Sequence, residues 1–200
     1  MAIPLEQLEG KLAEARRLYP AVERSMQQRG YLLQQAIAKG NAPPTVAQDY
    51  MLREQRTQWR CRLRVSATAV QAHALLWWLH HRTGSRYEAL DAILLRGDHR
   101  PLHFDSHFWS RWGLRTELMG VKLTNMMGFF KNYPQPPVGG VRRFYPEQPD
   151  YAAALVEGLI LGRQHGQRLI SCDTFKHHKL LSDGERKLWE MLMQKAAVGA

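Results

Sequence analysis

Residues 45–83 contain no glycine, proline or asparagine, and Pro43 and Pro44 precede this stretch while Gly84 follows it. A long segment without residues that end helices or form turns is typical of a single helix. The Ala-rich run at 67–79 adds strong helix formers to the segment. The sequence therefore predicts one long helix over 45–83, and this expectation dominates the predicted fold.

A helix over 45–83 gathers basic side chains on one face. At about 100° per residue, a narrow sector of this helix holds Arg53, Arg56, Arg60 and Arg64. Arg62 adds charge on another side, so residues 53–64 hold five arginines against one glutamate. Guanidinium groups bind phosphate well, so the row predicts contact with nucleic acid. The alternative is that these arginines pair with acidic residues of a neighbouring helix.

A strand is the competing interpretation of part of this stretch. Apolar and basic residues alternate strictly over 59–65, as they do in a half-buried strand: Trp59, Cys61, Leu63 and Val65 between Arg60, Arg62 and Arg64. The helix is preferred because a second set recurs at helical spacing: Leu52, Trp59, Leu63, Val70 and Trp77. Under both interpretations the arginines share a face.

The rest of the chain also indicates helices. An amphipathic pattern over 5–38 and the connector at 40–44 predict a helical hairpin with the long basic helix, residues 1–83. Further helices are expected over these ranges: 85–96, 106–131, 150–163 and 183–195. The last begins with a capping box, Ser182 and Glu185. We expect a mainly α protein in which 84–200 forms a compact helical body.

Two features qualify this helical body. A Pro- and Gly-rich loop at 132–148 divides it, and short extended segments at 141–145 and 169–172 are the expected minor β element. The two parts, 1–83 and 84–200, are expected to form one continuous domain, since a chain of 200 residues buries a sizeable core without disulfides or metals.

Composition indicates which class of partner and which cellular compartment to expect. The formal net charge of +10 indicates association with polyanions, although a general enrichment in arginine that only aids solubility would give the same balance. The two cysteines have no ligand-like spacing, which indicates a reducing compartment. No signal peptide and no apolar run long enough for a bilayer is apparent, so we expect a cytoplasmic protein without a membrane partner.

The segment from His99 to His107 is the strongest candidate for chemistry. In an extended chain His103, Asp105 and His107 point to one side, as a metal-dependent nuclease or another hydrolase requires. The pattern matches no standard metal motif, and Asp105 is equally suited to capping a helix that begins at Ser106. We therefore expect no catalytic residue, metal or cofactor here, and more generally a protein that is not an enzyme.

Aromatic and basic residues are interleaved over the next predicted helix. Trp109 and Trp112 are interleaved with His107, Arg111 and Arg115, an arrangement that favours stacking on unpaired bases beside phosphate contacts. Burial of both indoles in the core is the alternative.

Taken together, the patterns predict an accessory protein, or a subunit of a nucleoprotein assembly, that binds DNA or RNA. Its expected contacts are the five arginines at 53–64 together with Arg111, Arg115, Trp109 and Trp112. An adaptor whose basic hairpin binds an acidic protein is the first alternative, and the hydrolase at His99–His107 is the second.

Overall fold

Within the residues described by the computed structural model, nine strands form one mixed sheet. These residues are 3–81, 88–96, 99–116, 121–142, 148–166 and 168–198. The strand order is β1-β2-β3-β4-β5-β9-β8-β7-β6. Every neighbouring pair is antiparallel except β5 and β9, which are parallel.

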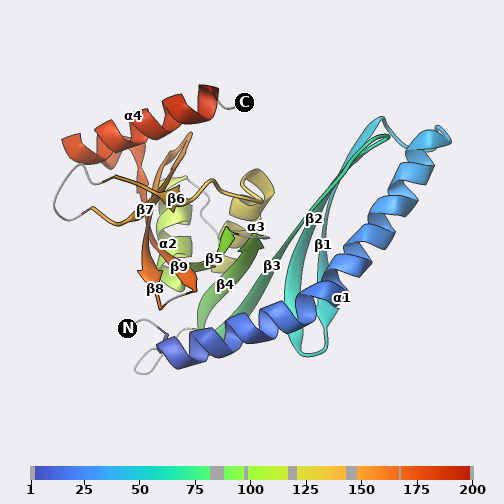
Figure 1. Ribbon diagram of the computed structural model, residues 1–200, viewed down its shortest axis with the longest axis horizontal. Coiled ribbons are helices and arrows are strands. Elements are labelled where there is room, and N and C mark those ends of the chain that lie inside the picture. The colour runs from blue at the N-terminus through green and yellow to red at the C-terminus, as the bar shows by residue number, and fades with distance from the viewer. Residues whose placement is uncertain are drawn as a thin grey trace.

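The elements follow one another along the chain as Figure 1 shows. The first half holds α1 (Leu5–Ala38), β1 (Thr45–Glu54), β2 (Thr57–Ser66), β3 (Val70–His81), β4 (Glu88–Arg96) and β5 (His99–Phe104). The second half holds α2 (Ser106–Arg115), α3 (Lys122–Asn132), β6 (Gly139–Gly140), β7 (Tyr151–Leu155), β8 (Gly158–His165), β9 (Leu169–His177), the short η1 (His178–Leu180) and α4 (Asp183–Val198).

The expectation of a mainly α, helical protein with a helical hairpin was wrong. The segment predicted as one helix over 45–83 forms β1, β2 and β3, which are joined by turns at 55–56 and 67–69. The alternation in β2 decides the outcome, because Trp59, Cys61, Leu63 and Val65 are all fully buried on one face. A helix would spread these side chains around its circumference, whereas a strand packs all four against a single helix.

Two other predicted helices are also strands. Residues 150–163 form β7 and β8 around a turn at 156–157, and 88–96 form β4, while 82–87 lie outside the described residues. Both segments are apolar enough to be buried on both faces of a sheet, a pattern that periodicity does not distinguish from a buried helix.

Other expectations were confirmed. The helix over 5–38 is α1, with Pro20 inside it, and the strand at 169–172 is the beginning of β9. The capping box at α4 forms: the Ser182 N–H donates to the Glu185 carboxylate at 3.0 Å, and the Glu185 N–H donates to the Ser182 hydroxyl at 3.5 Å. The segment predicted over 106–131 contains two helices, α2 and α3.

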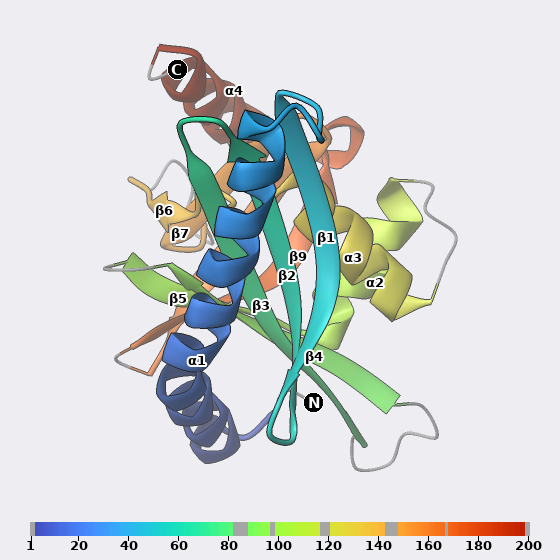
Figure 2. The same cartoon turned by 90° about the vertical axis from the view of Figure 1, so that its right-hand side faces the viewer.

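Helices cover the sheet unevenly. The long helix α1 lies along one face of β1 to β4, and α2 packs on the opposite face against β4 and β9, with α3 beside it (Figures 1 and 2). Consecutive residues of β3 show the two faces: Leu76 packs with the α1 residues Val22 and Met26, whereas Leu75 belongs to the aromatic core under α2 and α3. The last helix, α4, packs against β7 and β8. No helix among the described residues is long and apolar enough to cross a membrane.

Candidate nucleic-acid interface

Strand β2 places its arginines on the face of the sheet that points away from α1. Arg60, Arg62 and Arg64 alternate with the buried residues that contact α1, so they project from the other side. Arg53 of β1 lies opposite Gln58 in the ladder and therefore shares this side. We call these four residues, Arg53, Arg60, Arg62 and Arg64, the arginine face.

Among the described residues, one carboxylate forms ion pairs with the arginine face. Asp49 of β1 is directly opposite Arg62, and its Oδ2 accepts a hydrogen bond from Arg62 Nη1 at 2.7 Å. Its Oδ1 lies 3.5 Å from Arg60 Nη2. A single carboxylate leaves a surplus of positive charge on the arginine face, since Arg53 and Arg64 are exposed and Arg60 and Arg62 share one partner.

The side chains of Arg60 and Arg62, beside Asp49, are partly buried and contact its carboxylate. Their side chains are 14% and 19% exposed, and Arg60 Nε is buried without a hydrogen-bond partner in the described part of the chain. Partial burial reduces the screening of charge by water, so an anion that reaches these groups is bound more strongly than at a fully solvated arginine.

His73 of β3 borders the same surface, directly opposite Arg62. Burial lowers the pKa of the His73 imidazole, and the positive charge of Arg62 lowers it further. The ring is therefore neutral at neutral pH and adds no charge to the arginine face, although it remains a hydrogen-bonding group.

The other predicted contact residues lie elsewhere. Arg56 is in the turn between β1 and β2, beside Gln55, whose φ of 51° is in the left-handed region. Arg111 and Arg115 are on α2, where Arg115 donates a hydrogen bond to the carbonyl of Phe175. The five arginines predicted on one helix thus become four on a sheet face and one at a hairpin tip.

The two tryptophans are not placed for base stacking. Trp109 and Trp112 are 0% and 1% exposed. Their rings pack against Phe129 with centroid separations of 5.8 and 5.0 Å, in the aromatic core between the sheet and helices α2 and α3. Their spacing in the sequence reflects the buried face of α2 and not a binding surface, so the prediction that they contact nucleic acid is corrected.

The histidine segment does not converge on a metal site. His103 is buried in β5, Asp105 caps α2 by accepting from the Phe108 N–H at 2.8 Å, and His107 is exposed on the helix. Among the described residues, no group of three or more His, Cys, Asp or Glu side chains is arranged to hold a metal ion. The interpretation of Asp105 as a helix cap is confirmed.

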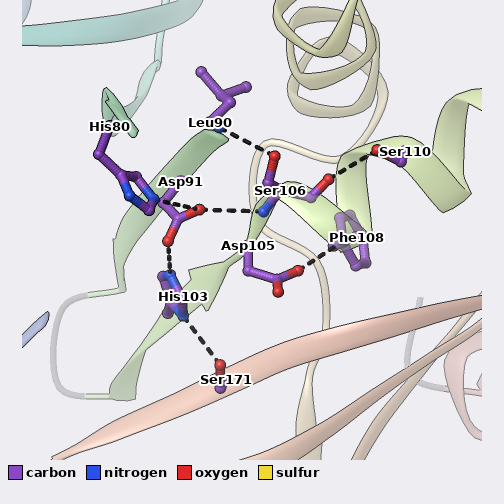
Figure 3. A network of polar contacts seen from close by, with 9 residues as sticks. All are labelled: His80, Leu90, Asp91, His103, Asp105, Ser106, Phe108, Ser110 and Ser171. Carbon is purple, nitrogen blue, oxygen red and sulfur yellow. Dashed lines mark hydrogen bonds and ion pairs between the residues drawn. The ribbon is translucent and has the colours of Figure 1, made fainter. Parts of the chain in front are cut away.

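A buried polar network centred on Asp91 was not predicted. Asp91 lies between His80 and His103, at 3.3 Å and 3.1 Å, and also accepts from the Ser106 N–H at 3.1 Å (Figure 3). His103 Nδ1 is 3.0 Å from the Ser171 hydroxyl on β9. The sequence signal is a single carboxylate inside an apolar run, Ala89 to Leu95, since a buried charge requires partners.

Electrostatics keep the Asp91 carboxylate ionised. Burial alone raises its pKa, but the hydrogen bond and charge of His103, together with His80, outweigh burial and lower the pKa below its ordinary value. Because an ionised carboxylate only accepts, His103 Nε2 carries the proton that it donates to Asp91.

The contacts run from Ser171 to His103 and from His103 to Asp91, as in a Ser-His-Asp hydrolytic triad. The surroundings of these residues do not suit catalysis. Ser171 is 6% exposed, and His103 and Asp91 are 2% and 0% exposed. A nucleophile must reach its substrate and needs donors aimed at the developing oxyanion. Here α1 residues Leu8 and Leu12 pack on this side of β4 and β9, so the network connects strands inside the fold.

Comparisons of the chain with protein-family models, with curated proteins and with solved structures found no match.

Proposed function

We propose that the protein binds nucleic acid through the arginine face, as an accessory protein or subunit of a nucleoprotein assembly. The observation that carries this proposal is the set of three alternate arginines on β2, joined by Arg53 on β1, on the side of the sheet away from α1. Arg60 and Arg62 share one carboxylate, Asp49, while Arg53 and Arg64 are exposed, so the surface is suited to an anionic partner.

The spacing supports a partner with repeated negative charges. Alternate residues of a strand are about 6.5 to 7 Å apart, so Arg60, Arg62 and Arg64 form a row of guanidinium groups and not a single anion pocket. Guanidinium groups form bidentate hydrogen bonds with phosphate oxygens. Contacts of this kind position a nucleic acid backbone without reading its sequence.

The same surface is open to an acidic protein, so the test must separate the two partners. Labelled duplex DNA, single-stranded DNA and RNA of equal length are titrated with wild-type protein and with a variant in which Arg53, Arg60, Arg62 and Arg64 are replaced by Gln. The control replaces four exposed arginines that lie outside the arginine face, Arg16, Arg24, Arg163 and Arg168, and removes the same charge.

We expect the arginine-face variant to lose affinity for nucleic acid by a much larger factor than the control variant. Equal losses would mean that only net charge matters and would contradict a defined interface. No binding by the wild type at low salt would reject nucleic acid and leave the acidic protein partner.

A further inference from the structure

The two edges of the sheet are very different. The edge strand β6 is the two-residue segment Gly139–Gly140, whereas β1 at the opposite edge is ten residues long. All ten residues of β1 pair with β2 without a register shift. A short edge strand protects a sheet from pairing with other chains, and a long regular one invites it.

β1 carries the charged residues Asp49, Arg53 and Glu54 but lacks several other features that protect edges. It contains no proline, no lysine and no bulge, and Met51 near its centre is 42% exposed. No strand of the described residues pairs with its outer side. The backbone N–H and C=O groups along this side therefore remain available for a ladder with another strand.

We propose that β1 pairs with β1 of a second copy, antiparallel, around a two-fold axis through Met51. In this register the numbers of facing residues sum to 102, so Asp49 faces Arg53 of the partner subunit, and Arg53 faces the partner subunit's Asp49. Met51 faces Met51 of the partner subunit. The charges and the exposed methionine of β1 are thus complementary to the same strand rotated by 180°.

Neighbouring registers are less favourable. An axis through Asp49 places the two aspartates opposite each other, and an axis through Tyr50 places Asp49 opposite a methionine. Facing opposite charges stabilise an antiparallel pair, and facing like charges destabilise it. Only the axis through Met51 brings both Asp49–Arg53 pairs together.

The other face of β1 is compatible with this arrangement. Tyr50 and Leu52, both half-buried, face each other across the axis, so an aromatic ring meets an aliphatic side chain twice. Arg29 of α1 already lies over the Tyr50 ring, 4.4 Å from its centroid, and donates to Gln48 at 2.7 Å. The resulting dimer has one continuous sheet with both arginine faces on the same side.

Cysteine cross-linking tests the register directly. Facing residues of an antiparallel pair have Cα atoms about 4.5 to 5.5 Å apart, within disulfide range. Met51→Cys should therefore form a disulfide-linked dimer under mild oxidation. Ala47→Cys is the control on the same face of β1, because its copies would be roughly 27 Å apart in this register. The native Cys61 and Cys172 are buried and do not compete.

Cross-linking of Met51→Cys without cross-linking of Ala47→Cys supports the proposal. Absence of cross-linking at both positions, or equal cross-linking at both, overturns it. The proposed dimer does not depend on nucleic-acid binding. The samples are therefore treated with nuclease and checked for absence of nucleic-acid absorbance, so that bound nucleic acid does not bridge two copies.

A second measurement uses the charges and does not require oxidation. Sedimentation equilibrium should show a dimer for the wild type. Arg53→Asp places two aspartates opposite each other twice and should weaken the dimer roughly tenfold or more, whereas Arg53→Lys should leave it largely intact. A monomeric wild type, or equal dimerisation of Arg53→Asp and Arg53→Lys, would contradict the pairing.

Discussion

The imidazole of His103 and the carboxylate of Asp91 are 3.1 Å apart on the neighbouring strands β5 and β4, in the interior of the protein. Asp91 is 0% exposed and also lies 3.3 Å from His80, so one carboxylate serves two histidines. Through the Ser106 N–H it also holds the first residue of α2. This contact therefore connects the centre of the sheet to the helix that covers its other face.

Replacing Asp91 by Asn should be strongly destabilising. The amide removes the negative charge and keeps only one acceptor oxygen for contacts that now use both carboxylate oxygens. Breaking a buried pair in this way costs about 3–5 kcal/mol of unfolding free energy. Urea unfolding followed by circular dichroism measures the loss. His107→Gln on the exposed side of α2 is the control and should change stability by less than about 0.5 kcal/mol. Equal stabilities of the two variants would show that the network carries no stability.

The stability difference between the wild type and Asp91→Asn should depend on pH in one direction. The pKa of Asp91 is lower in the folded protein than in the unfolded chain, so its ionised form stabilises the fold fully above the ordinary carboxyl pKa of about 4. The contribution is lost as pH falls through the lower, folded pKa. Unfolding measured from pH 7 down to pH 3 should show a difference that decreases only at the acidic end. A decrease that begins near neutrality would contradict the assignment.

Two glycines should respond oppositely to alanine. A Cβ at Gly113 in α2 would lie 2.0 Å from Nδ2 of Asn125, whose amide donates to the Trp109 carbonyl at 3.2 Å, so Gly113→Ala must displace the α2–α3 contact. A Cβ at Gly10 in α1 meets nothing within 4 Å. Gly10→Ala should therefore stabilise the protein by up to about 1 kcal/mol, the difference in helix propensity, while Gly113→Ala destabilises it. Thermal melts compare the pair, and stabilisation by both would refute the close helix contact.

The native thiols should be nearly unreactive. Burial raises the pKa of Cys61 to about 11, although a hydrogen bond with Tyr50 and the nearby arginines oppose the shift. Burial also raises the pKa of Cys172 far above its ordinary value. Because the thiolate is the reactive form, a thiol reagent at pH 8 should label both residues only as fast as the protein unfolds. Rapid labelling of either cysteine without denaturant would contradict the burial of these thiols in β2 and β9.

The sequence predicted the ends of the chain better than its middle. Helix α1 and the capping box at α4 are specified by local patterns, which do not depend on distant partners. The strands β1 to β3 were missed because their turns, at 55–56 and 67–69, contain no glycine, proline or asparagine. Propensity favoured a helix there, and tertiary burial of Trp59 and its alternate neighbours overrode it.

The sequence predicted that Arg60 and Arg64 share a face, and this holds for a strand as well as for the predicted helix. Alternation along a strand brings Arg60, Arg62 and Arg64 together, whereas the predicted helix would have grouped Arg56 with Arg60 and Arg64. Asp49 could not be foreseen as their partner, because its position depends on the register between β1 and β2. The Asp91 network likewise requires strands far apart in the sequence to meet.

The salt dependence of nucleic-acid binding tests the arginine face most directly. Each phosphate contact that is lost should flatten the slope of log K against log salt by about 0.9 for duplex DNA or about 0.7 for a single strand. We predict that replacing Arg53, Arg60, Arg62 and Arg64 by Gln flattens this slope and weakens binding, in a variant whose circular dichroism matches the wild type. An unchanged slope and affinity in that folded variant would contradict the account.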